Sequence, residues 1–467
     1  MNPAGRPGRH NEPRRRTRHD GTVREGEVVM GGWKRDGGRR AAWRVATLFA
    51  VVVDVGAVGA AEPWPRFRGA DGAGQGGVVR FPRQWADDGW AWRATLPGSG
   101  HASPVVWGDG VFTASAEVDP ADPTRGTRII TRHALAGGRQ TWDLRLPGPF
   151  DRHHAFNSSA SGTLTAGPEG VCWAWGTAAG IHLVAVGHDG TRQWQVDLGP
   201  FVSEHGYAGS PALHGDLVII AVEHEGPSFV AAFDRATGRE RWRLPREPGR
   251  ATYATPLIAP GPDPLLVVAS TTHGLTGIDP ATGRVLWERR CFPKRAVSSP
   301  LLVGPAAERL VIGTCGDGGG DNGLFALRLP VANDAAAPAE PPIAFQLDRS
   351  VAPYVPTPVA GAAGLYLWGD RGVVTCVDPA NGAVRWRGRV GGTYSASPLV
   401  VGGTVVNVAA DGEVVVLADG AEFEILGRTA LGEECRSSPA VAGGHLLFRS
   451  KSKLHAVAAL PAAARAP

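Results

Sequence analysis

The sequence contains few of the residues that build redox centres and covalent cross-links. Its 467 residues include two methionines and five cysteines. No two cysteines are adjacent and none forms a C-x-x-C pair, so the sequence has no haem-attachment site, zinc knuckle or dithiol motif. The odd count leaves at least one thiol unpaired, and we expect most to be small buried apolar side chains. The five are Cys172, Cys291, Cys315, Cys376 and Cys435.

Motifs for nucleotide binding and nucleophilic catalysis are also missing. The sequence has no G-K-[ST] phosphate loop and no G-x-S-x-G elbow. Gly72, Gly74 and Gly77 match G-x-G-x-x-G in letters, but no strand precedes them and no helix follows. The segment "CGDGGGDNG" at 315–323 offers oxygen ligands without the spacing of an EF-hand, so we expect a glycine-rich turn there. We assign no catalytic residue.

Positive charge is concentrated at the N-terminus. Residues 1–44 hold 12 Lys and Arg against five Asp and Glu, and the remainder holds 36 against 39. The net charge of +4 therefore belongs to the leader. Because the rest of the chain has no basic excess, we expect no nucleic-acid partner.

The leader resembles an export signal. Arginines precede an apolar run at 45–58, and the small residues 59–61 follow it. This order is typical of a secretory signal peptide at about 31–61, although Asp54 interrupts the run. The run is short and interrupted for a membrane span, so we expect a periplasmic or secreted protein without a stable span after cleavage. An uncleaved signal anchor is the alternative, and Met30 is a second candidate start.

The sequence does contain a repeat. Its first marker is a hydroxyl residue that precedes a proline, and an apolar strand follows this pair. Successive copies are separated by 40–58 residues, which is typical of four-stranded propeller blades. In the second copy glycine replaces the proline. The hydroxyl residues are Ser103, Ser161, Ser210, Thr255, Ser299, Thr357, Ser397 and Ser438.

A second marker is glycine followed four residues later by tryptophan. In "DPATGRVLWERR" the side chains of Asp279 and Thr282 can accept bonds from nearby backbone N–H groups, and Gly283 suits a positive φ. The constant spacing holds each tryptophan on one face of its strand, where it can pack against the next blade. We expect this structural role for Trp92, Trp142, Trp194, Trp242, Trp287 and Trp386.

The eight starts predict an all-β, eight-bladed propeller over residues 90–460, and seven blades is the alternative. The last blade, from Ser438, supplies three strands, and the strand at 90–98 supplies the fourth, which closes the ring without an exposed edge. Residues 62–89 are then an N-terminal extension after a basic leader and signal at 1–61, and 461–467 are a short tail. We expect a monomer.

Two blades depart from the tryptophan pattern. In blade five, "VANDAAAPAEPPIAFQLDRS" predicts that Phe345 replaces the tryptophan, with a surface loop at 331–342. In blade seven, "ADGAEFEILG" offers Phe423 or Ile425.

The motif Asp-x-x-Thr-Gly-x-x-x-Trp after an apolar strand resembles the repeat of the pyrroloquinoline quinone (PQQ) propeller superfamily. That superfamily includes quinoprotein alcohol dehydrogenases and the outer-membrane assembly lipoprotein BamB. The segments "WPRFRGADGAGQG", "HHAFNSSAS", "EHGYAGSP" and "VAPYVPTPV" are similar to exported PQQ-like repeat proteins of planctomycetes, whose molecular function is undefined. The resemblance covers about residues 63–460 and is specific for fold more than for function.

The resemblance to quinoprotein dehydrogenases implies calcium-bound PQQ, an Asp base, Glu and Asn ligands and adjacent cysteines. Adjacent cysteines are missing, and the base and ligands match no motif in this sequence. We therefore expect no cofactor, and PQQ with calcium is an alternative that no ligand motif supports. A BamB-like lipid anchor would need a cysteine after the signal, where Glu62 stands instead.

One cluster of polar residues precedes the first three blades. These connections run from an outer strand to the next inner strand and share one face of a propeller, so their side chains could converge at the axial mouth. Histidines there could bind a metal or transfer protons, whereas the plainer interpretation is that they order the blade junctions. The residues are His101, Asp151, His153, His154, Asn157, Glu204, His205 and Tyr207.

The sequence therefore predicts an exported, non-enzymatic propeller that binds a protein or glycan partner in the cell envelope. The alternative is a PQQ- or metal-dependent oxidoreductase.

Overall fold

The computed structural model describes residues 63–305, 308–318, 320–329 and 340–461. The leader and signal predicted at 1–61 lie outside these residues, as does most of the loop predicted at 331–342. Within the described residues no helix has the length and apolar character to cross a membrane.

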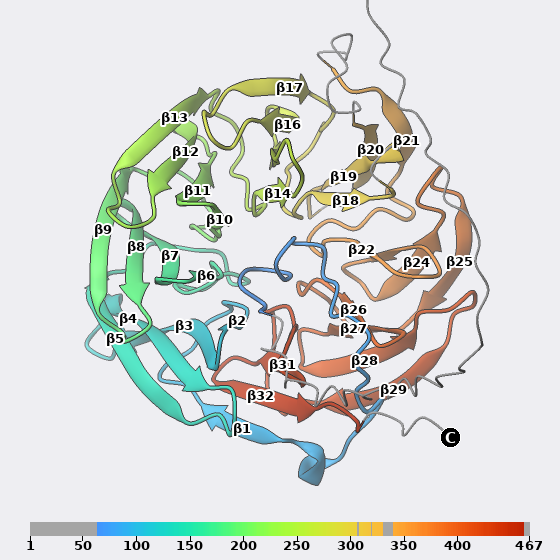
Figure 1. Ribbon diagram of the computed structural model, residues 1–467, viewed down its shortest axis with the longest axis horizontal. Helices are drawn as coiled ribbons and strands as arrows, with labels where there is room; N and C mark the ends of the chain where they lie inside the picture. Colours follow the sequence, from blue (N-terminus) through green and yellow to red (C-terminus); the bar gives the residue numbers. More distant parts are fainter. Residues whose placement is uncertain (1–62, 306–307, 319, 330–339, 462–467) are drawn as a thin grey trace, which may run out of the picture. The chain divides into compact units, whose positions relative to one another are not determined.

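The described chain forms eight four-stranded antiparallel sheets arranged as blades around an axis (Figure 1). From the inner to the outer strand, blades one to four consist of β2 (Val105–Trp107), β3 (Gly110–Asp119), β4 (Asp122–Ala134) and β5 (Gln140–Pro149); β6 (Thr165–Gly167), β7 (Gly170–Thr177), β8 (Gly180–Gly187) and β9 (Arg192–Gly199); β10 (Ala212–His214), β11 (Leu217–Val222), β12 (Ser228–Asp234) and β13 (Glu240–Arg246); and β14 (Leu257–Ala259), β15 (Leu265–Ser270), β16 (Gly274–Ile278) and β17 (Val285–Arg289).

Blades five to seven repeat this order, and blade eight draws on both ends of the chain. Their strands are β18 (Leu301–Val303), β19 (Leu310–Cys315), β20 (Gly323–Arg328) and β21 (Ile343–Leu347); β22 (Val359–Ala360), β23 (Leu365–Trp368), β24 (Val373–Val377) and β25 (Val384–Arg389); β26 (Leu399–Val401), β27 (Thr404–Val408), β28 (Glu413–Ala418) and β29 (Ile425–Ala430); and β30 (Ala440–Ala442), β31 (His445–Arg449), β32 (Lys453–Ala458) and β1 (Trp92–Thr95).

The N-terminal strand closes the ring as the sequence predicted. β1 pairs antiparallel with β32, with Trp92 opposite Ala456, and Leu96 continues the pairing through its N–H to Ser452. A short 3₁₀ helix, η1 (Asp87–Gly89), precedes this strand. Eight blades are therefore confirmed and the seven-bladed alternative is wrong.

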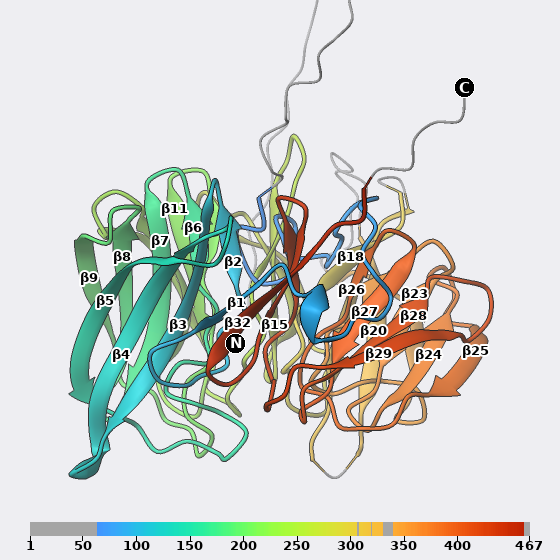
Figure 2. The same ribbon diagram turned by 90° about the horizontal axis from the view of Figure 1, so that it is seen from below.

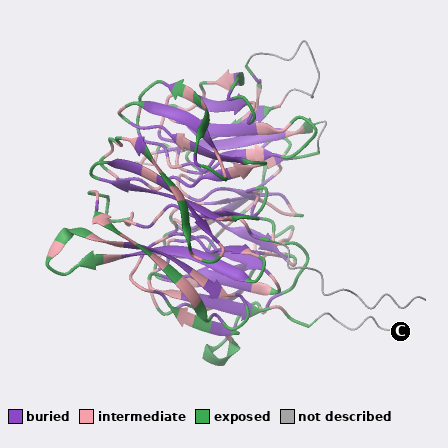
Figure 3. Ribbon diagram, turned by 60° about the vertical axis from the view of Figure 1, so that its left-hand side comes forward, coloured by how far each residue is buried: buried purple, intermediate pink, exposed green. Residues whose placement is uncertain are grey.

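Apolar residues fill the spaces between neighbouring blades. Most buried positions lie along the strands, whereas exposed ones lie in turns and outer strands (Figure 3). The five cysteines are free thiols, and four of them are buried, which matches the apolar role expected for most of them.

The hydroxyl residues of the first marker link the blades into a ring. At seven junctions the backbone N–H of one marker residue donates to the marker hydroxyl of the next blade, over 2.8–3.1 Å. In blade two this hydroxyl belongs to Thr163, not to the predicted Ser161. The reason is register: the hydroxyl stands two residues before the inner strand, and β6 begins at Thr165.

The tryptophans of the second marker dock on the following blade. Five indole Nε1 groups donate to backbone carbonyls there, as Trp242 does to Pro280 over 3.0 Å. The ring of Trp242 lies against Gly283, where a Cβ would come within 2.6 Å of it. Trp287 is buried among apolar residues of blades four and five. All six tryptophans therefore lie at junctions between blades.

Phe345 replaces the tryptophan of blade five, because it packs against Gly382 as Trp242 packs against Gly283. In blade seven both predicted residues are wrong. In blade three Trp242 pairs with Ala232, and the equivalent pair in blade seven is Gly427 with Val416. A glycine therefore occupies the tryptophan position of blade seven. The backbone of Arg83 takes the place of the ring, since a Cβ on Gly427 would lie 2.1 Å from its carbonyl oxygen.

The N-terminal extension crosses one end of the axis. It pairs with blade one at Trp64 and with blade seven at Gln75 (Figures 1 and 2). Between them, two buried arginines donate to carbonyls near the inner strands of several blades: Arg66 to Pro256, and Arg68 to Thr357, Pro358 and Pro398. The extension therefore caps this end of the ring.

Candidate functional site

A cavity of about 1060 Å³ occupies the axis of the ring. All eight residues of the hydroxyl ring line it, together with Phe67 from the N-terminal extension. Inner strands begin at this cavity and run toward the extension, as β2 does between Ser103 and the Trp64 contact at Val106. The cavity is therefore entered from the face of the outer-to-inner connections and closed at its floor.

The structure brings five of the eight predicted site residues to this cavity. They are His101, His154, Asn157, Glu204 and His205.

Three predicted residues do not line the cavity. Tyr207 is buried edge-on against Phe201, and Asp151 accepts a bond from the Tyr207 N–H over 3.4 Å. His153 is exposed and its Nδ1 lies 3.2 Å from the His154 carbonyl oxygen. Asp151 and Tyr207 thus make their contacts within the connections between blades and not with the cavity.

At the mouth of the cavity, the connections into blades two and three contact each other. The rings of His154 and His205 stack with centroids 5.2 Å apart, and Asn157 Nδ2 donates to the His205 carbonyl over 2.8 Å. Phe156 is 65% exposed beside them, with the Arg436 guanidinium 4.4 Å from its ring centroid. The mouth therefore presents flat aromatic surfaces.

Sequence reasoning missed the arginines of the cavity. They come from blades three to eight and share no motif, so neither marker points to them. Their position in the sequence could have indicated them, because several of these arginines lie a few residues before a marker hydroxyl, as Arg295 lies before Ser299. The cavity arginines are Arg250, Arg295, Arg349, Arg371, Arg387 and Arg436.

Arg295 is the most buried of these arginines, with 6% of its surface exposed. Its Nη1 lies 3.1 Å from His205 Nε2, and its Nε has no hydrogen-bond partner among the described residues. No carboxylate of the described residues lies within 4.0 Å of its guanidinium. The wall of the cavity thus carries a buried cation held by neutral groups.

Two cavity histidines, His101 and His205, have lowered pKa values and add little positive charge at neutral pH. Burial, with the positive charges of Arg449 and Arg436, lowers the pKa of His101 to about 3. Burial and then Arg295 lower the pKa of His205. A neutral His205 can accept the Arg295 bond at Nε2. Six arginines then face three carboxylates, those of Glu204, Asp317 and Asp370.

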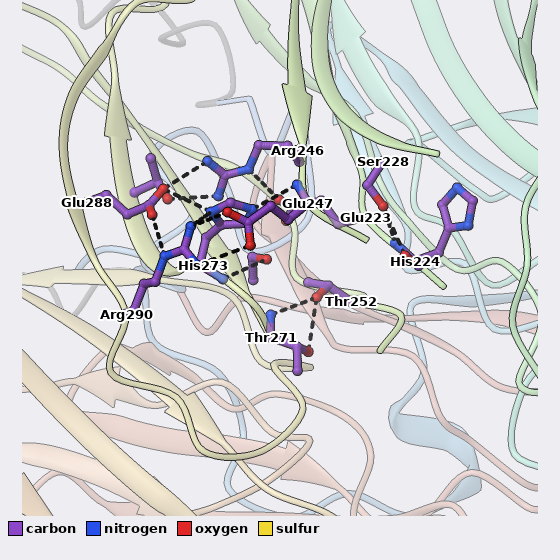
Figure 4. A network of polar contacts seen from close by, with 12 residues as sticks. Glu223, His224, Ser228, Arg246, Glu247, Thr252, Thr271, His273, Glu288 and Arg290 are labelled. Atoms are coloured by element: carbon purple, nitrogen blue, oxygen red, sulfur yellow. Dashed lines mark hydrogen bonds and ion pairs between the residues drawn. The ribbon is translucent and has the colours of Figure 1, made fainter. Parts of the chain in front are cut away.

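A polar network between blades three and four holds one cavity-lining connection (Figure 4). Arg246 bonds Glu223 over 2.6 Å and Glu288 over 3.3 Å, and Glu288 also contacts His273 and Arg290. The connection at 247–252 is tied to this network by three backbone N–H groups, which donate to His273 Nε2, the His224 carbonyl and the Glu223 carbonyl. The network therefore fixes the backbone beside Arg250 and Tyr253.

The donor set does not fit a calcium-bound quinone. Within the described residues there is no group of three or more His, Cys, Asp or Glu side chains able to hold a metal ion. Two cavity carboxylates are already engaged: Asp370 accepts the N–H groups of Tyr354 and Val355, and Asp317 accepts a bond from Lys294.

The eight blades and their docked tryptophans define a β-propeller of the PQQ-like kind. The sequence model of the family described as outer membrane protein assembly factor BamB matches residues 226–327 and 345–460. No curated protein sequence matches the chain.

Several solved structures share this fold. Quinohemoprotein alcohol dehydrogenase ADHIIG from Pseudomonas putida HK5 is 14% identical with a TM-score of 0.59, over 87% of this chain and 82% of that one. BamB from Moraxella catarrhalis is 16% identical with a TM-score of 0.55, over 78% and 97%. A europium-containing methanol dehydrogenase is 13% identical with a TM-score of 0.60, over 84% and 90%. These findings confirm the PQQ-like propeller fold inferred from the sequence.

Proposed function

We propose that the protein is a non-enzymatic binding protein of the cell envelope and that its axial cavity receives a glycan partner. The observation that carries this proposal is the cavity of about 1060 Å³, closed at one end and floored by a ring of hydroxyl groups. This volume lies at the upper limit of small-ligand sites, which span about 300–1,000 Å³. A ligand of several rings would therefore fit it.

The lining favours a glycan over a protein surface. Sugar rings have hydroxyl edges and apolar C–H faces, and this cavity offers hydroxyl groups below and the rings of Phe156, Tyr253 and Tyr354 around them. A standard protein interface buries about 800 Å² on each partner over a broad surface, whereas this site is concave. The envelope location is supported by the signal predicted at about 31–61 and by the description of the matching family.

Blocking the cavity tests the proposal. Gly318 lines the cavity and Gly148 does not, and a Cβ at either position would meet no atom within 4 Å. The full chain is titrated calorimetrically with a panel of neutral and acidic oligosaccharides. We expect the best oligosaccharide to lose at least about tenfold in affinity in Gly318→Trp, because the indole occupies its space, and to keep its affinity in the control Gly148→Trp.

Equal affinity in both variants would place the site elsewhere, and a panel without any binder would contradict a glycan partner.

A further inference from the structure

The charge of the cavity narrows the class of ligand, and this inference rests on the proposed function. Six arginines and three carboxylates line the cavity. Two of the carboxylates already accept bonds from Lys294 or from backbone N–H groups. By contrast, Arg250 and Arg371 are exposed at the cavity surface, without an ion pair among the described residues. Two of the six arginines are paired, Arg436 with Glu434 over 2.7 Å and Arg349 with Asp321 over 3.6 Å. The other four have no ion pair among the described residues, so the cavity keeps an excess of positive charge.

Arg295 is a buried side chain in the wall of this positively charged cavity. Burying a charge is costly unless polar groups compensate it, and Arg295, with 6% exposure, has no carboxylate within 4.0 Å among the described residues. Here its partners are neutral, the imidazole of His205 and the hydroxyl of Tyr354, and its Nε is without a partner in the described part of the chain. The planar fork of donors in arginine suits carboxylate and other oxyanions.

The hydroxyl ring adds a second set of donors. Seven of its oxygens accept a backbone N–H of the neighbouring blade, as Ser299 accepts from Thr255 over 3.0 Å. Among the described residues no acceptor is found for the O–H groups of this ring, which line the cavity floor. The floor can therefore donate to an oxygen-rich ligand, while Arg295 attracts its negative charge from the wall.

We propose that the axial cavity binds an acidic saccharide, with its anionic group on Arg295 and its hydroxyl groups over the ring of serine and threonine residues. Uronate carboxylates and sulfate esters share the oxyanion chemistry that Arg295 would recognise, and binding experiments distinguish the two.

The experiment uses two matched pairs of probes on the full chain. The first pair is trigalacturonate and its neutral methyl ester, and the second is a sulfated galactose tetrasaccharide and its desulfated form. We expect one acidic probe to bind at least about tenfold more tightly than its neutral partner, and to weaken as salt is raised. The pair that shows the difference identifies carboxylate or sulfate as the recognised group.

Arginine variants locate the anionic group. Arg295→Gln should weaken the acidic probe about 10- to 100-fold and leave the neutral probe unchanged, because one charge-assisted contact is lost. Arg250→Gln, at an exposed position, keeps the test valid if the buried variant does not fold, and should weaken the acidic probe several-fold. Arg239→Gln is the control, because Arg239 is exposed in the turn between β12 and β13 and does not line the cavity.

The outcomes separate this inference from the proposed function. Equal binding of acidic and neutral probes, insensitive to the arginine variants but blocked in Gly318→Trp, would overturn the acidic specificity and leave the glycan cavity in place. Binding of no saccharide, or binding that Gly318→Trp does not affect, would overturn both.

Discussion

At the residue scale, several ionisable side chains are buried in forms that the unfolded chain does not favour. His455 is 1% exposed, and its Nε2 lies 2.8 Å from Ser450 Oγ. Burial lowers its pKa to about 4 from 6.5. The native state therefore holds a neutral imidazole in a pH range where the unfolded chain binds a proton.

This difference predicts a pH dependence of stability. As pH falls below about 6.5 the unfolded state gains a proton that the native state does not take up until about pH 4, so the native state loses stability across this window. Between pH 7 and pH 4 the wild type should lose about 3 kcal/mol more than His455→Gln, as measured by chemical unfolding. His153→Gln, which removes an exposed imidazole, should follow the wild type. Parallel curves for all three proteins would contradict the buried neutral imidazole.

At the element scale, four junctions between blades are formed by a tryptophan that packs on a glycine of the next blade. The glycines of these turns have positive φ, with +74° at Gly283 and +81° at Gly137. The two positions differ in their surroundings, because a Cβ on Gly283 would lie 2.6 Å from the Trp242 ring, whereas one on Gly137 would meet nothing within 4 Å. The pair therefore separates backbone strain from blade docking.

Alanine at these two glycines should have unequal effects on unfolding. Gly137→Ala carries only the strain of positive φ, about 1–2 kcal/mol. Gly283→Ala carries a similar strain and also displaces the Trp242 ring, so it should cost about 1–3 kcal/mol more. Chemical unfolding monitored by tryptophan fluorescence measures both variants. Equal destabilisation would show that the ring does not hold the junction.

The strands were largely predictable because each copy of the repeat can be compared with the other copies. Eight copies fixed the blade count, and a three-stranded last copy pointed to the strand at 90–98. The errors fell where a copy departs from the repeat. Without its proline, blade two did not show that Thr163 and not Ser161 carries the hydroxyl. In blade seven a distant backbone, at Arg83, stands where other blades carry a ring, and no local pattern encodes that contact.

At the scale of the whole molecule, the N-terminal extension gives the ring a floor. Arg66 and Arg68 donate to carbonyls of blades four, six and seven, and Phe67 between them lines the cavity. The sequence predicted an extension at 62–89 but not its path, because these contacts join residues up to about 330 positions apart. For the same reason the cavity was predicted only from its first three connections, and the arginines of the later blades were missed.

We propose that this cavity binds a glycan and does not carry out quinone chemistry. The most direct test is a calorimetric titration of the full chain with PQQ in the presence and absence of Ca²⁺, followed by a dye-linked dehydrogenase assay on alcohols. We expect no calcium-dependent one-to-one binding and no dye reduction, because the described residues contain no group of three or more His, Cys, Asp or Glu side chains able to hold a metal ion. Calcium-dependent one-to-one binding with turnover would contradict it and make the cavity an active site.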